Sequence, residues 1–377
     1  MPMPETSTGP PIRPALDAHV VGHRKTGNET YVVNLAEALT RRQDTRPIAY
    51  VDVGAVWPHP EGPETRELRS RAPFLRIPFE LPVRARRDRC DLLHVQYVAP
   101  PWPGLPLVTA IHDVSFEDVP GLFARETELR LRLTVRLSAR RSQAVVTISE
   151  FTRDRLVHHY GLNPEKIVVT PLGVDPLWRP LAPDDAAARL REFDPPESFV
   201  LAVGNLHPRK NIPRLIRAVA AARNAGAGDL HLLLAGQRWW RSDYIDRTVE
   251  DANATGWVRL LGYVANDVLP ALYSAATVVA YPSLYEGFGL PVVEALACGA
   301  VVVASNTTSI PEVAGKAAVL IDPTDVAAMA DAVAMAATDQ GLRTILKKAG
   351  PLQAAGFTWD RCAERTVAAY RIALSGR

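Results

Sequence analysis

The stretch YPSLYEGFGLPVVEALACGAVVVAS, residues 281–305, decides the fold class of this chain. An apolar strand is expected to end near Tyr281, and a loop with two glycines follows it. A helix is expected from about Gly289 to Cys298, and a second, fully apolar strand from Val301. A strand, a helix and a further strand in this order make a βαβ unit, which places the two strands parallel in one sheet.

The same alternation extends along the whole chain. Short runs rich in Val, Ile and Leu are separated by helix-length segments, which is typical of parallel sheets covered by helices. In the first half the expected strands are residues 16–21, 48–53, 92–97, 107–111, 144–148 and 167–170. In the second half they are residues 199–203, 230–235, 258–262, 277–281, 301–304 and 319–321. We therefore predict an α/β protein with two doubly wound, Rossmann-like domains, whose ligands bind in loops at the carboxyl ends of the strands, facing a central cleft.

Prolines mark the boundary between the two sets of strands. Five of them fall within residues 175–198, around a short polar helix, which is typical of a linker. The extreme N-terminus is also rich in proline. The predicted division is a disordered segment 1–14, an N-terminal domain 15–175, a linker 176–198, a C-terminal domain 199–355 and a C-terminal helix 356–377.

Composition excludes several classes of protein. Of the 377 residues, 47% are hydrophobic and 22% are charged, which excludes wholesale disorder. The 43 basic residues nearly balance the 41 acidic ones, so no nucleic-acid partner is indicated. No apolar run approaches the roughly 18–20 residues of a membrane span, and no signal peptide is recognisable, so we expect a cytoplasmic protein. Three widely spaced cysteines favour a reducing compartment over a disulfide framework.

Two glutamates in the deciding stretch are candidate ligand-binding residues. Glu294 interrupts an otherwise apolar helix, and a buried carboxylate needs a polar partner, for which a ligand hydroxyl is a candidate. Gly287 and Gly289 let the backbone approach a ligand, and the free amides of the first helical turn favour an anion. Glu286 lies just before these amides. Both glutamates also have a structural interpretation, Glu286 as a helix cap and Glu294 as a core carboxylate.

A second loop has the same placement after the expected strand 199–203. Arg209 and Lys210 lie at the start of the next helix, with Asn211 as its expected cap. No acidic residue is near them in sequence, which suits a diphosphate carrying two negative charges. Exposed surface cations are the alternative interpretation.

Other nucleotide motifs do not fit. Gly22 and Gly27 have the spacing of a P-loop, but Asn28 and Glu29 replace its Lys-Ser/Thr pair, and Val292 stands where a dinucleotide-binding loop needs its third glycine. No Asp-x-Asp or clustered His/Cys spacing occurs, so we expect no metal site.

Two features of the first half remain open. His112 ends the expected strand 107–111, so it is predicted to point into the cleft, although a lone histidine is more often structural. The helix 125–141 alternates Leu with Arg and either contacts an anionic surface or is a solvated amphipathic helix.

These motifs resemble the retaining, nucleotide-sugar-dependent glycosyltransferases of family 4, also called glycosyl transferases group 1, which have the GT-B fold. The resemblance spans nearly the whole chain, and its most specific part is Glu286-Gly-Phe-Gly-Leu-Pro-Val-Val-Glu294. The supporting pieces are Ser309-Ile-Pro-Glu312-Val, Pro208-Arg-Lys-Asn211, Leu261-Gly-Tyr-Val264, Ile111-His-Asp-Val-Ser-Phe116, Ser149-Glu-Phe151 and Leu172-Gly-Val-Asp175. One departure is Thr26-Gly27-Asn28-Glu29, where the family often has Gly-Gly-x-Gly.

The resemblance implies a role for each matching residue. Arg209 and Lys210 would bind the donor diphosphate, Glu294 the ribose, and Glu286 the transferred sugar. His112 would lie beside that sugar, making His112, Glu286, Arg209 and Lys210 the catalytic set. The donor-binding set would be Gly27, Arg209, Lys210, Tyr263, Val264, Glu286, Gly287, Phe288, Gly289, Leu290 and Glu294. The C-terminal helix, with Trp359 and Tyr370, would cross back to the N-terminal domain.

The resemblance also implies the reaction. A mannosyl, glucosyl or rhamnosyl group would pass from a nucleoside diphosphate sugar to a glycan or lipid-linked acceptor, with retention of configuration and with no metal or tightly bound cofactor. The N-terminal domain would bind the acceptor and the C-terminal domain the donor. Polysaccharide assembly and a peripheral contact with the inner face of a membrane are further expectations. An epimerase, an inverting transferase with Asp113 or His112 as base, and a non-catalytic nucleotide-sugar binder are the alternatives.

Overall fold

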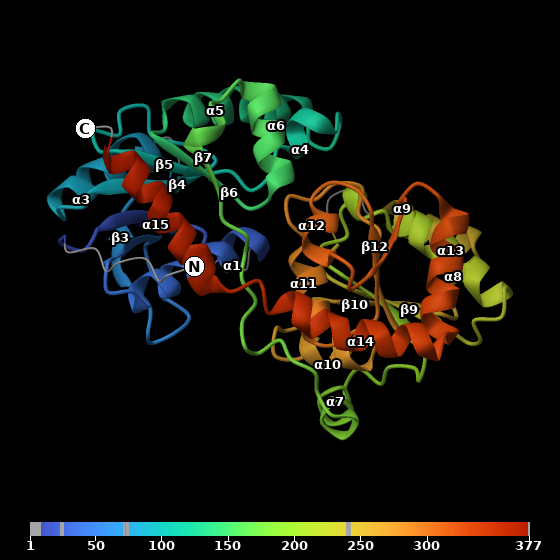
Figure 1. Cartoon of the computed structure of the whole chain (residues 1–377). Helices are drawn as coiled ribbons and strands as arrows, with labels where there is room; N and C mark the ends of the chain where they lie inside the picture. Colours follow the sequence, from blue (N-terminus) through green and yellow to red (C-terminus); the bar gives the residue numbers. More distant parts are fainter. Residues whose placement is uncertain (1–8, 23–25, 71, 73–74, 239–242, 376–377) are drawn as a thin grey trace. The chain divides into compact units, whose positions relative to one another are not determined.

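The computed structural model describes residues 9–22, 26–70, 72, 75–238 and 243–375. The chain divides into two compact units, each a parallel sheet flanked by helices (Figure 1). Unit 1 comprises residues 1–173 and 359–377, and unit 2 comprises residues 174–358. The predicted class, two doubly wound Rossmann-like domains, is therefore confirmed, and unit 1 is discontinuous in sequence. In the described part of the chain, no helix is both long and apolar enough to span a bilayer.

Unit 1 contains a seven-stranded sheet in the order β3-β2-β1-β4-β5-β6-β7, with every pair parallel. The strand order reverses between β1 and β4, and such a reversal leaves a crevice for ligands at the carboxyl ends of the two strands. The strands are β1 (Pro14–Asp17), β2 (Ile48–Asp52), β3 (Glu64–Leu68), β4 (Leu92–Gln96), β5 (Leu107–Ala110), β6 (Ala144–Thr147) and β7 (Ile167–Val169).

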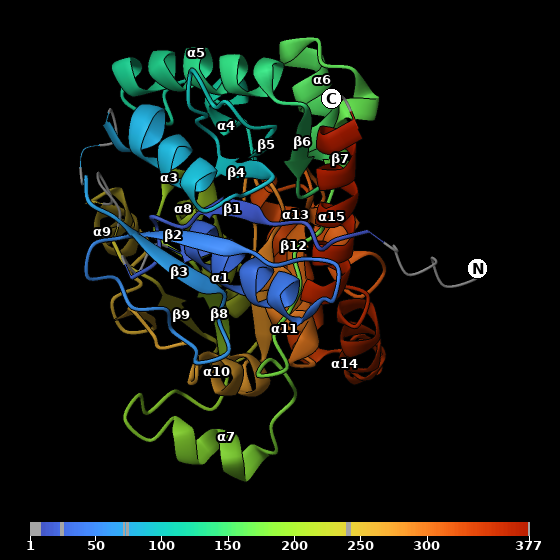
Figure 2. The ribbon, with the colours of Figure 1, turned by 90° about the vertical axis from the view of Figure 1, so that its left-hand side faces the viewer.

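Helices cover both faces of this sheet. Figure 2 shows α3 and α5 on one side of the strands and α1 on the other. The C-terminal helix α15 contacts α1, β6 and β7, so the predicted return of the chain to this domain is confirmed. The helices are α1 (Thr26–Arg41), η1 (Arg76–Glu80), α3 (Leu81–Arg87), α4 (Ser115–Asp118), α5 (Arg125–Arg141), α6 (Glu150–Tyr160), η2 (Pro164–Lys166) and α15 (Trp359–Ser375).

Unit 2 repeats this plan with the parallel order β10-β9-β8-β11-β12-β13, which reverses between β8 and β11. Its strands are β8 (Phe199–Val203), β9 (His231–Ala235), β10 (Val258–Gly262), β11 (Val278–Tyr281), β12 (Val302–Ser305) and β13 (Val319–Ile321). Its helices are α7 (Pro183–Arg189), η3 (Pro208–Lys210), α8 (Ile212–Asn224), α9 (Asp243–Asp251), α10 (Leu269–Ala275), α11 (Leu290–Ala297), α12 (Ile310–Ala314), α13 (Val326–Thr338) and α14 (Gln340–Ala354).

The core of unit 2 explains why its strands are apolar throughout. Helices α8 and α13 pack together over one face of the sheet, while α11 packs with α14 and α10. Strands covered on both faces read as continuous hydrophobic runs, as the deciding stretch does. At the carboxyl ends of β8 and β9 the backbones come close: a Cβ on Gly236, whose φ is +153°, would lie 2.0 Å from the carbonyl oxygen of Gly204.

Some elements differ from expectation. The first strand runs over Pro14–Asp17, not 16–21, because Ala15 and Leu16 pair with both neighbouring strands before the chain turns. Of the segment 1–14, residues 1–8 lie outside the described residues, whereas Ile12 forms a bridge with Thr45. Strand β3 was not expected, because this edge strand is polar and mostly exposed. The expected linker 176–198 contains α7, which contacts α10 within unit 2.

Candidate active site

The charged residues predicted from sequence meet where the strand order of unit 2 reverses. The loop after β8 leads into η3, which carries Arg209 and Lys210, and the loop after β11 carries Glu286. The backbone amide of Leu284 donates to the carbonyl oxygen of Arg209 at 2.8 Å, which joins the two loops directly. Because ligands of doubly wound sheets bind at this crevice, its position alone makes it the candidate site.

Lys210 lies at the centre of the cluster. Its Nζ lies 2.6 Å from Oε1 of Glu286, and it also donates to the hydroxyl of Tyr281. The same ammonium lies 4.4 Å from the centre of the Tyr281 ring, close enough for a cation–π contact. Gly204 leaves the space for this side chain, since a Cβ there would lie 3.3 Å from Cε of Lys210. The lysine is therefore held in one place before any ligand binds.

Glu286 is held in its ionised form by the two cations beside it. Burial alone would raise its pKa, but Lys210 and Arg209 outweigh burial and lower the pKa to about 2. The Arg209 guanidinium lies 4.0 Å from Oε2, the carboxylate oxygen that Lys210 does not contact. No acidic residue is near the two cations in sequence, but Glu286, from another loop, lies within 4.0 Å of both. A diphosphate would therefore bind to a site with one net positive charge from these three residues.

Asn211 holds three loops together, which is not the role expected from sequence. It occupies the N-cap position of α8, but with φ of 61° and no side-chain capping bond. Its Nδ2 instead donates to the carbonyl oxygens of Pro282, at 3.1 Å, and Pro323, at 2.6 Å. Asn211 thus lies at the predicted N-cap position, but its side chain does not cap the helix, because it joins the loops after β11 and β13.

The start of α11 presents backbone amides beside Glu286. Gly289 is the N-cap, with φ of 112°, and no side chain caps this helix, so the interpretation of Glu286 as a cap is wrong. Any other residue would be strained at this φ, and its Cβ would lie 2.6 Å from Cδ1 of Ile310, which would have to move. Oγ of Ser309 donates to the carbonyl oxygens of Glu286 and Phe288, which orients this loop. Free amides at a helix N-terminus suit a phosphate.

Glu294 lies one turn into the same helix and differs from Glu286 in its charge. Burial raises the pKa of Glu294 to about 7, and a 3.3 Å hydrogen bond from the hydroxyl of Tyr273 opposes this rise only in part. The polar partner that a buried carboxylate needs is thus supplied in part by the protein. A pKa near 7 means that this carboxyl is about half ionised at neutral pH.

This pKa gives a testable pH dependence. Between pH 6 and pH 8 Glu294 loses its proton, and an ionised carboxylate accepts hydroxyl hydrogen bonds more strongly than a neutral acid. We expect the ratio of nucleoside diphosphate affinities, native chain over Glu294→Gln, to rise about five- to tenfold over this range in titration calorimetry. Protonation of the phosphate cancels in the ratio. A ratio that is constant or falls with pH would contradict contact of Glu294 with the ribose.

The other residues predicted to bind the nucleotide-sugar donor differ in their exposure to solvent. Tyr263, after β10, is 58% exposed, whereas Val264 is buried. Gly287 and Phe288 are buried, and Leu290 is half-buried. Gly27 lies at the start of α1 in unit 1 and is exposed. The structure thus brings together Arg209, Lys210, Glu286 and the start of α11, while Gly27 and His112 belong to the other unit.

His112 follows β5 in unit 1 and is buried. The ring of Tyr31 meets it edge-on at 4.4 Å, and Tyr97 lies 5.6 Å away. Burial lowers the pKa of His112 to about 4, so the ring is neutral at physiological pH. Its Nε2 is buried and has no hydrogen-bond partner among the described residues. A neutral imidazole nitrogen of this kind can bind a ligand hydroxyl.

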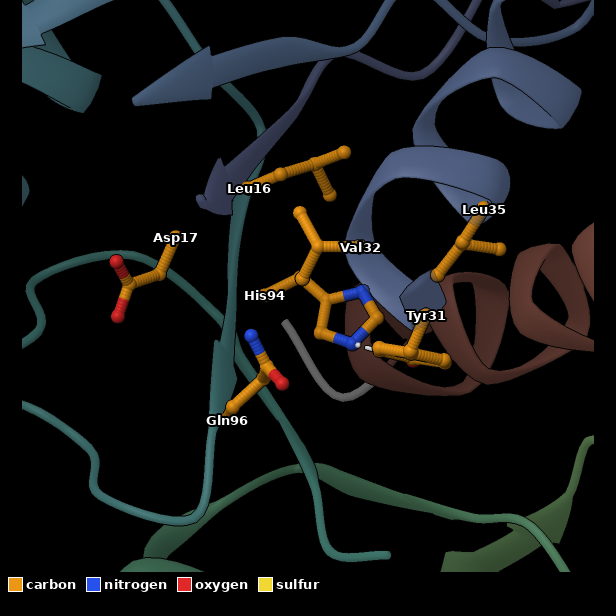
Figure 3. Close-up of a pocket in the computed structure, with 7 residues that line it drawn as sticks. All are labelled: Leu16, Asp17, Tyr31, Val32, Leu35, His94 and Gln96. Carbon is orange, nitrogen blue, oxygen red and sulfur yellow. Dashed lines mark hydrogen bonds between the residues drawn. The ribbon is translucent and has the colours of Figure 1, made fainter. Parts of the chain in front are cut away.

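A small pocket at the reversal of unit 1 contains residues that sequence reasoning missed. Figure 3 shows Asp17, His94 and Gln96 around it, with Tyr31 beside them. Both amide atoms of Gln96 are buried and have no hydrogen-bond partner among the described residues. His94 is held by Tyr370 at Nδ1 (2.7 Å) and by Tyr31 at Nε2 (3.2 Å). Their position at the ends of β1 and β4 is the feature of the sequence that could have identified them as candidate site residues.

Comparisons with known proteins follow the same division of the chain. Residues 26–177 match the family described as Glycosyltransferase Family 4, and residues 187–353 match Glycosyl transferases group 1. The chain is 34% identical over 266 residues to O-antigen chain mannosyltransferase B of Escherichia coli, covering 70% of each chain. It is 35% identical over 238 residues to D-inositol 3-phosphate glycosyltransferase of Salinispora tropica, covering 58% of this chain and 49% of that one.

Solved structures share the fold at low identity. Sucrose-phosphate synthase from Thermosynechococcus elongatus superposes with a TM-score of 0.78 and 22% identity, covering 97% of this chain and all of that one. Anabaena HepE in complex with UDP and glucose has a TM-score of 0.75 and 19% identity, covering 95% of this chain and 99% of that one. The fold, with two Rossmann-like domains, is therefore that of GT-B glycosyltransferases.

Proposed function

The chain belongs to glycosyltransferase family 4, and from this premise we propose that it transfers a hexosyl group from a nucleoside diphosphate sugar to a glycan or lipid-linked acceptor, retaining anomeric configuration without a metal ion. Mannosyl is the first candidate for the group transferred, because the relative matched over 70% of this chain is a mannosyltransferase. The observation that carries the proposal is the Arg209–Glu286–Lys210 cluster beside the start of α11, where the sheet of unit 2 reverses.

The donor would bind by charge and by backbone amides. Arg209 and Lys210 would contact the diphosphate, whose negative charge grows as the sugar leaves, and the first amides of α11 would add to this stabilisation. Two fixed cations and a helix N-terminus can do what a divalent ion does in other transferases. Among the described residues, no group of three or more His, Cys, Asp or Glu side chains is arranged to hold a metal.

The pKa of Glu286 limits its role. With a pKa of about 2 it cannot donate a proton near neutral pH, so it does not act as a general acid. Its oxygens can accept hydrogen bonds from hydroxyls of the transferred sugar. Retention then fits attack by the acceptor hydroxyl from the face that the diphosphate leaves, with the acceptor proton passing to the departing phosphate. We assign no protein nucleophile.

The acceptor would bind to unit 1. The side-chain amide of Gln96 offers a buried hydrogen-bond donor and a buried hydrogen-bond acceptor, which have no partner among the described residues. Asp17 and His94 line the same pocket. Such a set suits a hydroxyl-rich ligand, since each sugar hydroxyl both donates and accepts a hydrogen bond. This assignment supports a glycan as the acceptor.

Donor class is the first point to test. We expect one of UDP, GDP, ADP or deoxythymidine diphosphate to raise the melting temperature of the full chain, in EDTA as well as with Mg²⁺. A ligand at 100 times its dissociation constant adds about 2.7 kcal/mol to the free energy of unfolding. A shift that requires Mg²⁺ would contradict metal independence. The absence of any shift in folded protein would contradict nucleotide binding.

The stereochemistry needs a separate measurement. That screen identifies the nucleotide, and its sugar derivatives are then assayed as donors. The anomeric proton of the product, followed by NMR from the start of the reaction, should show the configuration of the active donor. The opposite configuration would make this an inverting enzyme, and release of free epimerised sugar would make it an epimerase.

A further inference from the structure

An exposed apolar stripe runs along α5 of unit 1. Leu129, Leu133 and Leu137 are 69%, 59% and 43% exposed, and their spacing of four residues places them on one side of the helix. The opposite side packs into the core through Val135 and Ala139. Exposed leucines scattered singly are ordinary, but three in a row along one helix form a continuous patch.

A second stripe with the same spacing precedes and enters α3. Leu75, Phe79 and Val83 are 47%, 54% and 45% exposed. Trp102, in the loop between β4 and β5, is 70% exposed. A tryptophan with most of its surface in solvent is unusual, because its large ring is normally buried at least in part.

Hydrogen bonds place these three segments on one face of unit 1. The amide of Ala99, at the start of the Trp102 loop, donates to Oγ of Ser138 in α5 at 2.9 Å. At the other end of the loop, the carbonyl oxygen of Gly104 accepts from Nε of Arg86 in α3 at 3.3 Å. The loop therefore lies between the two helices, which cover the same side of the sheet (Figure 2). We name these seven apolar residues and the arginines around them the α3–α5 face.

The α3–α5 face is strongly basic. Helix α5 contains six arginines and two glutamates, and one of those glutamates, Glu128, is paired with Arg132. Helix α3 contains three arginines and no acid. In the described part of the chain, Arg130, Arg136 and Arg141 form no ion pair. The exposed arginines of the face are Arg86, Arg87, Arg125, Arg130, Arg136, Arg140 and Arg141.

We propose that the α3–α5 face docks on the surface of an anionic lipid bilayer. The leucine stripe, Phe79 and Trp102 would enter the boundary between headgroups and acyl chains, while the arginines contact lipid phosphates. Charge complementarity selects this occupant. A second copy of the chain would bring arginines against arginines, and a nucleic acid would leave the apolar stripe uncovered. The proposal does not rest on the proposed transfer reaction.

Co-sedimentation of the full chain with lipid vesicles tests the proposed docking on a bilayer. We expect the protein to pellet with phosphatidylcholine vesicles containing 30% phosphatidylglycerol, and at least tenfold less with pure phosphatidylcholine. Arg130→Gln together with Arg136→Gln should weaken binding about tenfold or more, because each arginine near an anionic surface contributes to binding. Leu133→Gln together with Trp102→Gln should do the same at unchanged charge. Higher salt should weaken binding of the native chain.

Controls separate docking from folding and from activity. Ile345 and Leu352 of α14 are 65% and 79% exposed but belong to unit 2, so Ile345→Gln with Leu352→Gln should leave vesicle binding unchanged. Each variant should keep the native melting temperature and its nucleotide-induced shift, so that failure here is distinct from failure of the proposed function. Equal binding to neutral and anionic vesicles, or no binding to either, would overturn the proposal. So would a concentration-dependent dimer, in sedimentation velocity, that Leu133→Gln dissociates.

Discussion

Replacing Lys210 with methionine is expected to lower kcat/KM for glycosyl transfer by about 10²- to 10³-fold and to destabilise the chain by about 3–5 kcal/mol. Two separate causes produce these effects. The loss of activity follows from removing a fixed cation at the proposed diphosphate position. The loss of stability follows because Glu286, 7% exposed at its side chain, keeps its charge but loses the partner at 2.6 Å, leaving Arg209 at 4.0 Å.

A double variant separates the two causes. Lys210→Met combined with Glu286→Gln removes both charges of the pair, so most of the lost stability should return, since a neutral pair is cheaper to bury than a lone charge. Activity should not return, because the diphosphate still lacks its cation and Glu286, the proposed partner of the transferred sugar, is changed as well. Lys348→Met, at an exposed position of α14, is the matched control and should change neither quantity. Recovery of activity in the double variant would show that Lys210 serves only to neutralise Glu286.

Substitution of Gly236 by alanine should destabilise the chain by at least about 3 kcal/mol and weaken nucleotide binding. The new Cβ would meet the backbone of Gly204 at 2.0 Å, and a backbone neighbour cannot rotate away as a flexible side chain can. The end of β8 would have to move, and the loop it carries leads to Lys210. The amide of Gly236 also donates to the carbonyl oxygen of Gly262 at 2.7 Å, so the end of β10 would be affected too.

Gly226→Ala is the matched control for this prediction. Gly226 also has a positive φ, +96°, but a Cβ there would meet nothing within 4 Å. It should therefore show only the cost of an unfavourable backbone conformation, about 1 kcal/mol. Chemical denaturation measures the stability of both variants, and calorimetry measures nucleotide affinity. If Gly236→Ala loses no more than Gly226→Ala, the close approach of the two strand ends is not what requires a glycine.

Sequence patterns predicted the parts of this fold that depend on local periodicity. The ends predicted for the apolar strands of unit 2 and for the helix from Gly289 to Cys298 lie within one residue of the observed ends. The strands are covered on both faces and are therefore hydrophobic at every position, which makes them easy to place. Strand β3 was missed for the opposite reason. It lies at an edge, pairs only with β2 and is mostly exposed, so its sequence ETREL carries no apolar signal.

Contacts between distant loops could not be predicted in the same way. Arg209, Lys210 and Glu286 were each selected from sequence, but the ion pair joins residues 76 positions apart. Only the order of strands brings β8 and β11 together, and a single sequence does not state that order. The same holds for Asn211, whose side chain was expected to cap its own helix but reaches carbonyls 71 and 112 residues away. Gln96 belongs to no motif in the sequence, and only its buried side-chain amide in the structure makes it a candidate ligand-binding residue.

The return of α15 to unit 1 has a consequence for synthesis. Unit 2 is one continuous segment and can fold once residues up to 358 have left the ribosome, whereas unit 1, whose other elements precede unit 2, lacks a covering helix until residues 359–377 have followed. Until then Tyr370 cannot reach His94, and the sheet surface that Cys362 and Val367 bury stays in water. Domains are usually completed in the order of their synthesis. Of these two units, the one that is begun first is completed second.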